Sequence, residues 1–296
     1  MNAQELEIYN FIRNDGIGFY EQKRGLIEVS GKESIQFLNG LITNDVAKLE
    51  ENEQMLAAFP NAQGRLLAAV RVMKKDGKFL FETEEATHEK VFQNLFRFTF
   101  AGDFFVEDLS GNYRFFRLLN FRSEIPNSIE FQANWGADYF IPINEAEDFL
   151  NELKNQNAFE ITEELFEILR IEQGIPLYGV DMDETTIVPE LGIDGLISYN
   201  KGCYIGQEII ARIYFRGHIA KQLMGLMFES EEVSINPGDE IKSAEGKNAG
   251  RITSVTFSPK LQKTIALGFV RYDYLAEETE LKIGDQTAAV KNLPLV

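Results

Sequence analysis

Apolar residues repeat along this chain at two spacings, and the spacing changes several times between its ends. Repeats every three or four residues, flanked by capping or stop residues, predict helices. Alternating or short continuous apolar runs between turn residues predict strands. Helices are expected over residues 3–13, 85–97, 145–155, 162–173 and 207–215. A further helix is expected between Ser30, as its cap, and Ile42, with Glu33 placed to complete a capping box. Strands are expected over residues 26–29, 55–59, 65–73, 78–81, 104–108, 113–121, 222–229, 239–243, 249–257, 264–271 and 279–290.

The order of these elements indicates the fold class. Hairpins and helices alternate up to about residue 220, and Asp76-Gly77 between two apolar runs is the strongest hairpin signal. The stretch 174–203 has no clear period, and it is not rich enough in serine and glycine to be a flexible linker. From residue 221 onward only short strands are expected, which is typical of a small β-barrel or sandwich. We therefore predict an α+β protein with domains 1–220 and 221–296.

Composition excludes several classes of function. A formal net charge of −18 argues against general nucleic-acid binding, because affinity for phosphate backbones comes largely from lysine and arginine. No apolar run is long enough to span a bilayer and the first residues lack the order of a signal peptide, so we expect a cytoplasmic protein without a membrane partner. One cysteine and two histidines are too few for a self-contained iron–sulfur or zinc site. No phosphate loop or complete dinucleotide fingerprint occurs.

Positive charge nevertheless gathers in one part of this acidic chain. Residues 201–221 hold Lys201, Arg212, Arg216 and Lys221 against the single acid Glu208. This island could receive an anionic ligand, but charge alone favours a solvated helix face that carries ordinary surface arginines.

The only cysteine lies in the stretch Lys201-Gly-Cys-Tyr-Ile-Gly-Gln-Glu208. Glycines at 202 and 206 permit backbone conformations closed to other residues and let a ligand approach closely. The helix expected from residue 207 would place Cys203 at its N-terminus, where the helix dipole and Lys201 favour a thiolate. Two interpretations stay open: a presented, reactive thiol, or a buried cysteine that acts as a small inert hydrophobe.

These eight residues resemble the signature of the YgfZ-type folate-binding proteins, which are relatives of the aminomethyltransferase (T-protein) of the glycine cleavage system. Three further stretches resemble the same superfamily in the expected order. They are residues 37–45 (FLNGLITND), residues 170–179 (RIEQGIPLYG), and residues 250–268, which begin GRITS and continue through SPKL. The resemblance implies two interleaved folate-binding subdomains followed by a small C-terminal β-barrel, arranged as three lobes around a central cavity.

The resemblance also implies tetrahydrofolate as the cofactor. In T-proteins the glutamate of the Arg-x-Glu-x-Gly stretch contacts the pterin, and Glu172 is the matching residue. A carboxylate suits that role because it accepts paired hydrogen bonds from the amino group and ring N–H of a pterin. The other residues that we assign to folate binding by this resemblance are Tyr204, Gln207, Arg212 and Arg216.

One departure from the T-protein pattern concerns mechanism. T-proteins carry an acidic pair near the reacting folate nitrogen, and Ala68 and Ala69 occupy the matching positions here. Alanine neither accepts a proton nor stabilises a developing cation, so aminomethyl transfer lacks its expected carboxylate. The resemblance implies instead a folate-dependent accessory role in assembling or repairing iron–sulfur clusters that requires the cysteine. We therefore take Cys203 as the reacting group, with Lys201 activating its thiol. The partners would be folate and iron–sulfur client proteins or assembly factors.

Two other functions stay open on the sequence alone. One is a one-carbon transferase whose acid–base group has moved, for instance to Glu208 or Asp45. The other is a non-catalytic binding scaffold in which residues 201–208 form only a tight turn. Whether the chain is an enzyme is left undecided by its residues.

Overall fold

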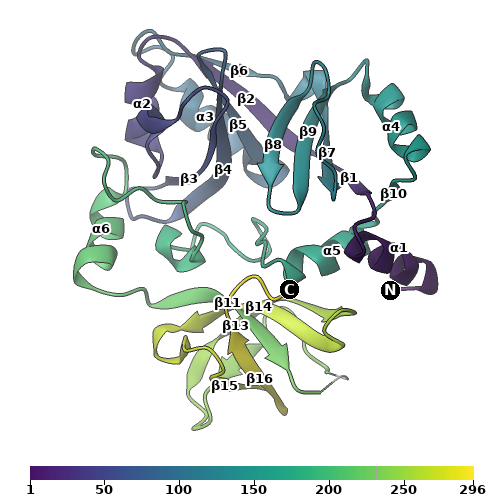
Figure 1. Ribbon diagram of the computed structural model, residues 1–296. Helices are drawn as coiled ribbons and strands as arrows, with labels where there is room; N and C mark the ends of the chain where they lie inside the picture. Colours follow the sequence, from purple (N-terminus) through teal and green to yellow (C-terminus); the bar gives the residue numbers. More distant parts are fainter. Residues whose placement is uncertain (231–232) are drawn as a thin grey trace. The chain divides into compact units, whose positions relative to one another are not determined.

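In the computed structural model, which describes residues 1–230 and 233–296, the chain passes back and forth between two units (Figure 1). The first unit contains residues 1–61, 67–165 and 195–205. The second contains residues 62–66, 166–194 and 206–296. Strands and helices are both present and most strand pairs are antiparallel, so the predicted α+β class is confirmed. The division into domains 1–220 and 221–296 stays a prediction.

One sheet of the first unit has the strand order β3-β4-β5-β2-β6. Its strands are β2 (Arg24–Ser30), β3 (Gln54–Pro60), β4 (Leu66–Lys75), β5 (Lys78–Glu84) and β6 (Phe105–Asp108). The β4–β5 hairpin turns at Asp76 and Gly77, both with positive φ, as the Asp-Gly pair predicts. Helices α2 (Ser34–Leu41) and α3 (Glu85–Phe96) supply Leu38 and Val91 to the core that covers this sheet.

The other sheet of the first unit has the order β10-β1-β7-β9-β8. Its strands are β1 (Gly18–Gln22), β7 (Tyr113–Leu119), β8 (Ile129–Ala133), β9 (Gly136–Pro142) and β10 (Phe159–Glu160). Helix α4 (Ala146–Asn155) covers it through Phe149 and Leu153, and α1 (Ala3–Arg13) precedes β1. The sequence did not predict β1, β8, β9 or β10. In β9 the strand pattern is obscured because nearly all of its residues are buried, including Asp138 within an apolar run.

Asp138 belongs to an ion-pair cluster that joins strands of the two sheets. Its carboxylate is fully buried and lies 2.6 Å from Arg71 Nη2 and 2.8 Å from Arg117 Nη2. Arg71 also pairs with Glu82, which pairs in turn with Arg24. Burial alone would raise the pKa of Glu82, but Arg24 and Arg71 lower it to about 2. Each charge of the cluster therefore has a counter-charge despite its burial.

The second unit contains a closed six-stranded barrel in the order β11-β14-β13-β12-β15-β16. The strands are β11 (Lys221–Phe228), β12 (Glu240–Lys242), β13 (Asn248–Ser258), β14 (Lys263–Arg271), β15 (Glu280–Ile283) and β16 (Gln286–Lys291). The predicted barrel is confirmed. The single strand predicted over 279–290 is wrong, because Gly284 adopts a positive φ and turns the chain back between β15 and β16.

The remaining helices flank the barrel or connect strands. They are α5 (Glu163–Glu172), α6 (Gln207–Arg216) and the short 3₁₀ segments η1 (Val46–Lys48), η2 (Ser110–Asn112), η3 (Val188–Leu191) and η4 (Tyr272–Tyr274). Thr162, the first residue of the helix predicted over 162–173, caps α5, because its Oγ1 accepts the N–H of Leu165 at 3.2 Å. The predicted Ser30 cap is wrong. Helix α2 begins at Ser34, and the Glu33 carboxylate accepts the N–H of Asp103 instead of closing a capping box.

Candidate functional site

Residues 195–205, which we call the cysteine segment, are the part of the first unit that lies furthest along the sequence. Two backbone hydrogen bonds fasten this segment to the last turn of α2 and the loop that follows: Ser198 N–H donates to the carbonyl of Thr43 at 3.0 Å, and Ile205 N–H donates to that of Gly40 at 3.1 Å. The structure therefore brings together two of the four motif stretches, residues 37–45 and 201–208.

Thr43 is the buried centre of this attachment. Its side chain is fully buried, and its Oγ1 donates to the carbonyl of Leu196 at 2.6 Å while accepting the N–H of Ala58 at 2.9 Å. Next to it, Asn44 Nδ2 donates to the carbonyl of Gly195 at 2.7 Å. Neither residue was predicted as functional. The signal available in the sequence was a run of polar residues directly after the apolar helix of the 37–45 motif.

Lys201, on the cysteine segment, adds side-chain hydrogen bonds to the same attachment. Its Nζ donates to the carbonyls of Ile42 at 2.7 Å and Asn44 at 2.6 Å. Burial lowers the pKa of Lys201 to about 8, an effect that attraction to Asp45 only partly opposes. A lysine in this state is partly neutral just above physiological pH, and its hydrogen bonds to carbonyls persist in either form because the neutral amine also donates.

The ring of Tyr204 lies beneath the Lys201 ammonium, with Nζ 5.1 Å from the ring centroid. Tyr204 is buried, and burial raises the pKa of its phenol to about 12, with a smaller contribution from Tyr199. The phenol is therefore neutral at physiological pH, and the ring supports the lysine as a cation–π partner. This contact gives Tyr204 a packing role in the first unit, while its predicted role in folate binding stays a prediction.

Cys203 is exposed on the cysteine segment between these buried neighbours. A methyl group built on the adjacent Gly202 would meet nothing within 4 Å, so the surroundings of the thiol are open. The prediction that Cys203 lies at the N-terminus of a helix is wrong. Gly206, at φ +79°, is the N-cap, and α6 begins at Gln207, four residues after Cys203. No hydrogen bond joins Lys201 to Cys203 within the described chain, so activation of the thiol by Lys201 stays a prediction.

Helix α6 displays more of its surface than its apolar pattern predicted. Ile210 is buried, but Tyr214 is 57% exposed and Phe215 is 66% exposed, and their rings meet edge to face. Arg212 forms an i,i+4 ion pair with Glu208 at 2.6 Å, and Arg216 is also exposed. Exposed ion pairs of this kind contribute little to stability, so the pairing leaves Arg212 able to exchange partners.

The other two motif stretches, residues 170–179 and 250–268, meet inside the second unit. Arg170 is fully buried and forms hydrogen bonds with Asp181 at 2.8 Å, Ser254 Oγ at 2.8 Å and the carbonyl of Ile175 at 3.1 Å. Asp181 also accepts hydrogen bonds from Thr253 and Ser254. Asp181 lies in the stretch 174–203, for which the sequence shows no clear period, and the structure gives it a structural function there.

Glu172 is likewise fully buried in the second unit. Its Oε1 accepts the hydroxyl of Ser258 at 2.5 Å, and its backbone carbonyl accepts the N–H of Leu295 at 2.8 Å. The predicted folate residues are divided between the units: Tyr204 lies in the first, and Gln207, Arg212 and Arg216 lie with Glu172 in the second. Carboxylate, phenol, amide and guanidinium groups are chemically suited to a pterin and its glutamate tail. A pterin reaches Glu172, however, only if the packing around its carboxylate opens.

Ala68 and Ala69 lie on β4. Ala68 is fully buried in the core of the first sheet, and Ala69 is half-buried. A carboxylate at position 68 would have to ionise within that apolar core, which is energetically costly. The first unit therefore has no acid at these two positions, in agreement with the departure from the T-protein pattern. Among the described residues, no group of three or more histidine, cysteine, aspartate or glutamate side chains is placed to hold a metal ion, and no helix is long and apolar enough to cross a membrane.

Comparison with known proteins gives a family model for the barrel. Residues 221–295 match the glycine cleavage T-protein C-terminal barrel domain. Among solved structures, the crystal structure of glycine cleavage system aminomethyltransferase T from Bartonella henselae superposes with a TM-score of 0.84, covering 98% of this chain and 89% of that one. The identity is 18%, so this likeness establishes the fold alone.

Three curated relatives are similar over most of the chain. The tRNA-modifying protein YgfZ of Hamiltonella defensa is 28% identical over 68% of this chain and 67% of its own length. The tRNA-modifying protein YgfZ of Shigella boydii is 26% identical over 80% of this chain and 79% of its own length. The mitochondrial iron–sulfur cluster assembly factor IBA57 homolog of Mycosarcoma maydis is 25% identical over 69% of this chain, and the match spans 55% of that protein.

Proposed function

Because the chain is a YgfZ-type relative of the glycine cleavage T-protein superfamily, we propose that it is a folate-dependent accessory protein for the assembly or repair of iron–sulfur clusters in client proteins. The observation that carries this proposal is the presentation of Cys203. The only cysteine of the chain is exposed on a segment that is fastened to the first unit by hydrogen bonds of the Thr43 hydroxyl and of the Lys201 ammonium.

The proposed chemistry of Cys203 is transient ligation. A thiolate is the form that binds iron, and one thiolate supplies one of the four protein ligands that a cluster normally requires. Cys203 therefore does not retain a cluster, and it acts only while a client supplies the other ligands. The hydrogen bonds that fasten the segment restrict its movement, which lowers the entropic cost of bringing the thiol to a client.

The relatives' names also mention tRNA modification, and we place that role with the clients. A chain with a net charge of −18 repels nucleic acid over most of its surface. An effect on tRNA then arises through a client enzyme that contains a cluster and acts on tRNA, without direct contact between this chain and RNA.

Aminomethyl transfer is the second candidate, favoured by the superfamily fold. The burial of Ala68 in the core of its sheet opposes it, because the position that carries an acid in T-proteins is filled here by a methyl group in apolar surroundings. A transferase would need another acid–base group, such as Asp45. Asp45, however, is already hydrogen-bonded to Asn39 and to the N–H of Ala47.

Complementation tests the role of the thiol. Cells that lack their own protein of this type would receive the wild type, Cys203→Ser or Gly202→Ala, and the activity of an iron–sulfur enzyme would be measured against its protein level. We expect Cys203→Ser to lose at least ten-fold in that activity. Gly202→Ala is the matched control, since it changes the neighbouring residue in open space and keeps the thiol. Full activity of Cys203→Ser would overturn the proposal.

Calorimetry tests the folate part separately. Tetrahydrofolate would be titrated into the wild type, Cys203→Ser, Glu172→Ala and Glu172→Gln. We expect Cys203→Ser to bind as the wild type does and Glu172→Ala to bind more weakly by on the order of ten-fold or more, as for loss of a charge-assisted hydrogen bond. Glu172→Gln controls for packing, because the amide oxygen still accepts the Ser258 hydroxyl. Absence of binding to the wild type would refute the folate dependence and leave the thiol function standing.

A further inference from the structure

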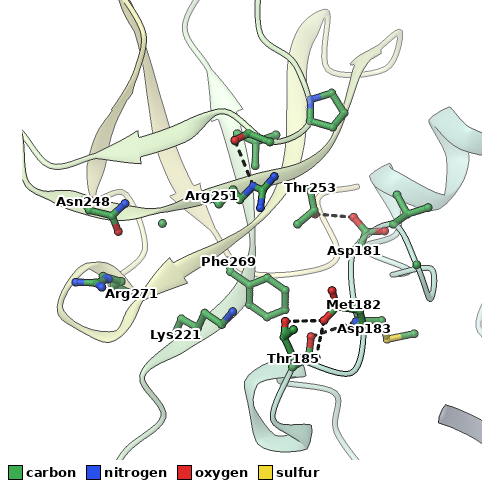
Figure 2. Close-up of a pocket in the computed structure, with 17 residues that line it drawn as sticks. Asp181, Met182, Asp183, Thr185, Lys221, Asn248, Arg251, Thr253, Phe269 and Arg271 are labelled. Atoms are coloured by element: carbon green, nitrogen blue, oxygen red, sulfur yellow. Dashed lines mark hydrogen bonds between the residues drawn. The ribbon is translucent and has the colours of Figure 1, made fainter. Parts of the chain in front are cut away.

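A cavity of about 550 Å³ lies in the second unit, and its lining includes none of the residues assigned to folate or to the thiol (Figure 2). The loop of residues 179–186 forms one wall, and the outer surface of β11, β13 and β14 forms the other. Figure 2 shows Phe269 at the centre of the site, with Lys221 and Arg271 on one side and the aspartates of the loop on the other. This volume is typical of a small-molecule site.

Three cations converge on the cavity from three neighbouring strands. Lys221 on β11 lies directly opposite Arg271 on β14 in the antiparallel register. Arg251 on β13 lies opposite Phe269, two residues from Arg271 on the same face of β14. Like charges directly opposite each other destabilise a sheet, so the placement of Lys221 and Arg271 is unfavourable unless an anion offsets it.

The protein itself offsets this charge only weakly. Lys221 Nζ lies 4.3 Å from the Phe269 ring centroid, and Arg251 Nε donates to the carbonyl of Gly238 at 3.2 Å. None of the three cations has a carboxylate within ion-pair distance among residues 1–230 and 233–296. They therefore keep their charge for a ligand.

The two aspartates of the cavity wall are occupied elsewhere. Asp181 is paired with Arg170, which lies outside the lining. Asp183 Oδ1 accepts both the N–H of Thr185 at 2.7 Å and its hydroxyl at 2.6 Å. These hydrogen bonds from Thr185, with a further contribution from Lys221, lower the pKa of Asp183. The lining thus carries an excess of positive charge within a strongly acidic chain.

We propose that this cavity binds the phosphate group of a small phosphorylated ligand. Lysine and arginine are the side chains that proteins use for phosphate, the first as a point charge and the second through a planar fork of donors. A phosphate ion alone is much smaller than the cavity, so the remaining volume accommodates the rest of an ester. The site is independent of the thiol and of Glu172, and its test does not rely on the proposed function.

Isothermal titration of the whole chain at low salt tests the site, with inorganic phosphate and adenosine monophosphate as the probes. We expect saturable binding that weakens by on the order of ten-fold or more in Lys221→Gln and in Arg271→Gln, as expected for loss of one charged donor. Lys282→Gln on β15 is the matched control, since it removes an exposed lysine of the same barrel outside the cavity. Arg271→Gln should also unfold at the same or a higher denaturant concentration than the wild type, because it removes the Lys221–Arg271 repulsion.

The titrations distinguish the sources of the phosphate. Tighter binding of adenosine monophosphate identifies an ester as the ligand, and equal binding identifies the free ion; both support a phosphate site. Absence of saturable binding of either probe overturns the proposal. An equal loss of affinity in Lys282→Gln also overturns the proposal, because the loss would then reflect the net charge of the chain and not the cavity. Binding of citrate in place of both probes would refute the choice of phosphate.

Discussion

Replacing Lys201 with methionine should remove a rise in stability between pH 8 and pH 10. The pKa of Lys201 is about 8 in the folded chain, against 10.5 for an ordinary lysine. Below pH 8 the ammonium is charged in both the folded and the unfolded state, and the folded state bears the cost of burying it. As the pH rises from 8 towards 10.5, the folded state releases its proton while the unfolded state keeps it, so the folded state gains stability. The gain is at most about 3 kcal/mol, at roughly 1.4 kcal/mol for each ten-fold change in the proton-binding constant, because solvent at the half-buried ammonium screens part of the effect.

The assay for this prediction is urea denaturation followed by tryptophan fluorescence at pH values from 7.5 to 10. Trp135 is the only tryptophan and lies in the same unit as Lys201, so it reports the relevant unfolding. Tyr204, whose pKa is about 12, keeps its proton in the folded state above pH 10 and would lower stability there, which sets the upper limit of the range. Lys154→Met, at an exposed position on α4, is the control.

The comparison uses the slope of the free energy of unfolding against pH, because Lys201→Met also changes stability at neutral pH. Methionine removes the buried charge, but it leaves the carbonyls of Ile42 and Asn44 without their donor, at about 1–3 kcal/mol each. We expect the free energy of unfolding of the wild type and of Lys154→Met to rise with pH relative to Lys201→Met. Parallel curves for all three proteins would show that the ammonium is not destabilised by its surroundings, and would refute the reasoning.

Three further predictions follow from the buried hydrogen bonds and from the thiol. Arg170→Met should destabilise the second unit by about 3–5 kcal/mol, because Asp181 loses its counter-charge, and circular dichroism in urea measures the loss. The double variant Arg170→Met/Asp181→Asn should lose less, and an equal loss in the double variant would contradict this reasoning. Thr43→Val should cost the first unit about 2–4 kcal/mol by tryptophan fluorescence, since two buried backbone groups lose their partner; a loss below about 1 kcal/mol would argue against the attachment. Cys203 should react with one equivalent of a disulfide reagent in the native protein, and a reaction that requires denaturant would mean that the thiol is buried.

The fold was predicted from sequence wherever a local signal sufficed. Asp76-Gly77 specified its hairpin, Thr162 capped α5, and short strands after residue 221 indicated the barrel. The strand β9 was missed because its buried Asp138 depends on Arg71 and Arg117, which lie far away in sequence. Periodicity does not reveal a charge whose partner comes from another sheet.

The sequence indicated which residues belong to the candidate site better than it indicated which groups they contact. The glycine context of Cys203 suggested a presented thiol, and the structure exposes it. The same context also suggested a helix N-terminus, which is wrong because Gly206 turns the chain before α6 begins. Thr43 and Asp181 were missed because some of their buried hydrogen bonds are to residues more than 70 positions away. The polar run after the helix of the 37–45 motif was a local signal for Thr43, but it does not reveal these partners.

The discontinuous course of the chain determines the order in which the first unit is completed during synthesis. Most of this unit has been made once residue 165 is reached, but its cysteine segment follows only at residues 195–205. At about 5–20 residues per second, the ribosome needs roughly 2 to 8 s to advance from residue 165 to residue 205. Until then the Thr43 hydroxyl and the carbonyl of Ile42 lack the partners that they have in the folded chain. Nascent chains that end before residue 205 therefore leave the ribosome without a fastened thiol, and only longer products display one.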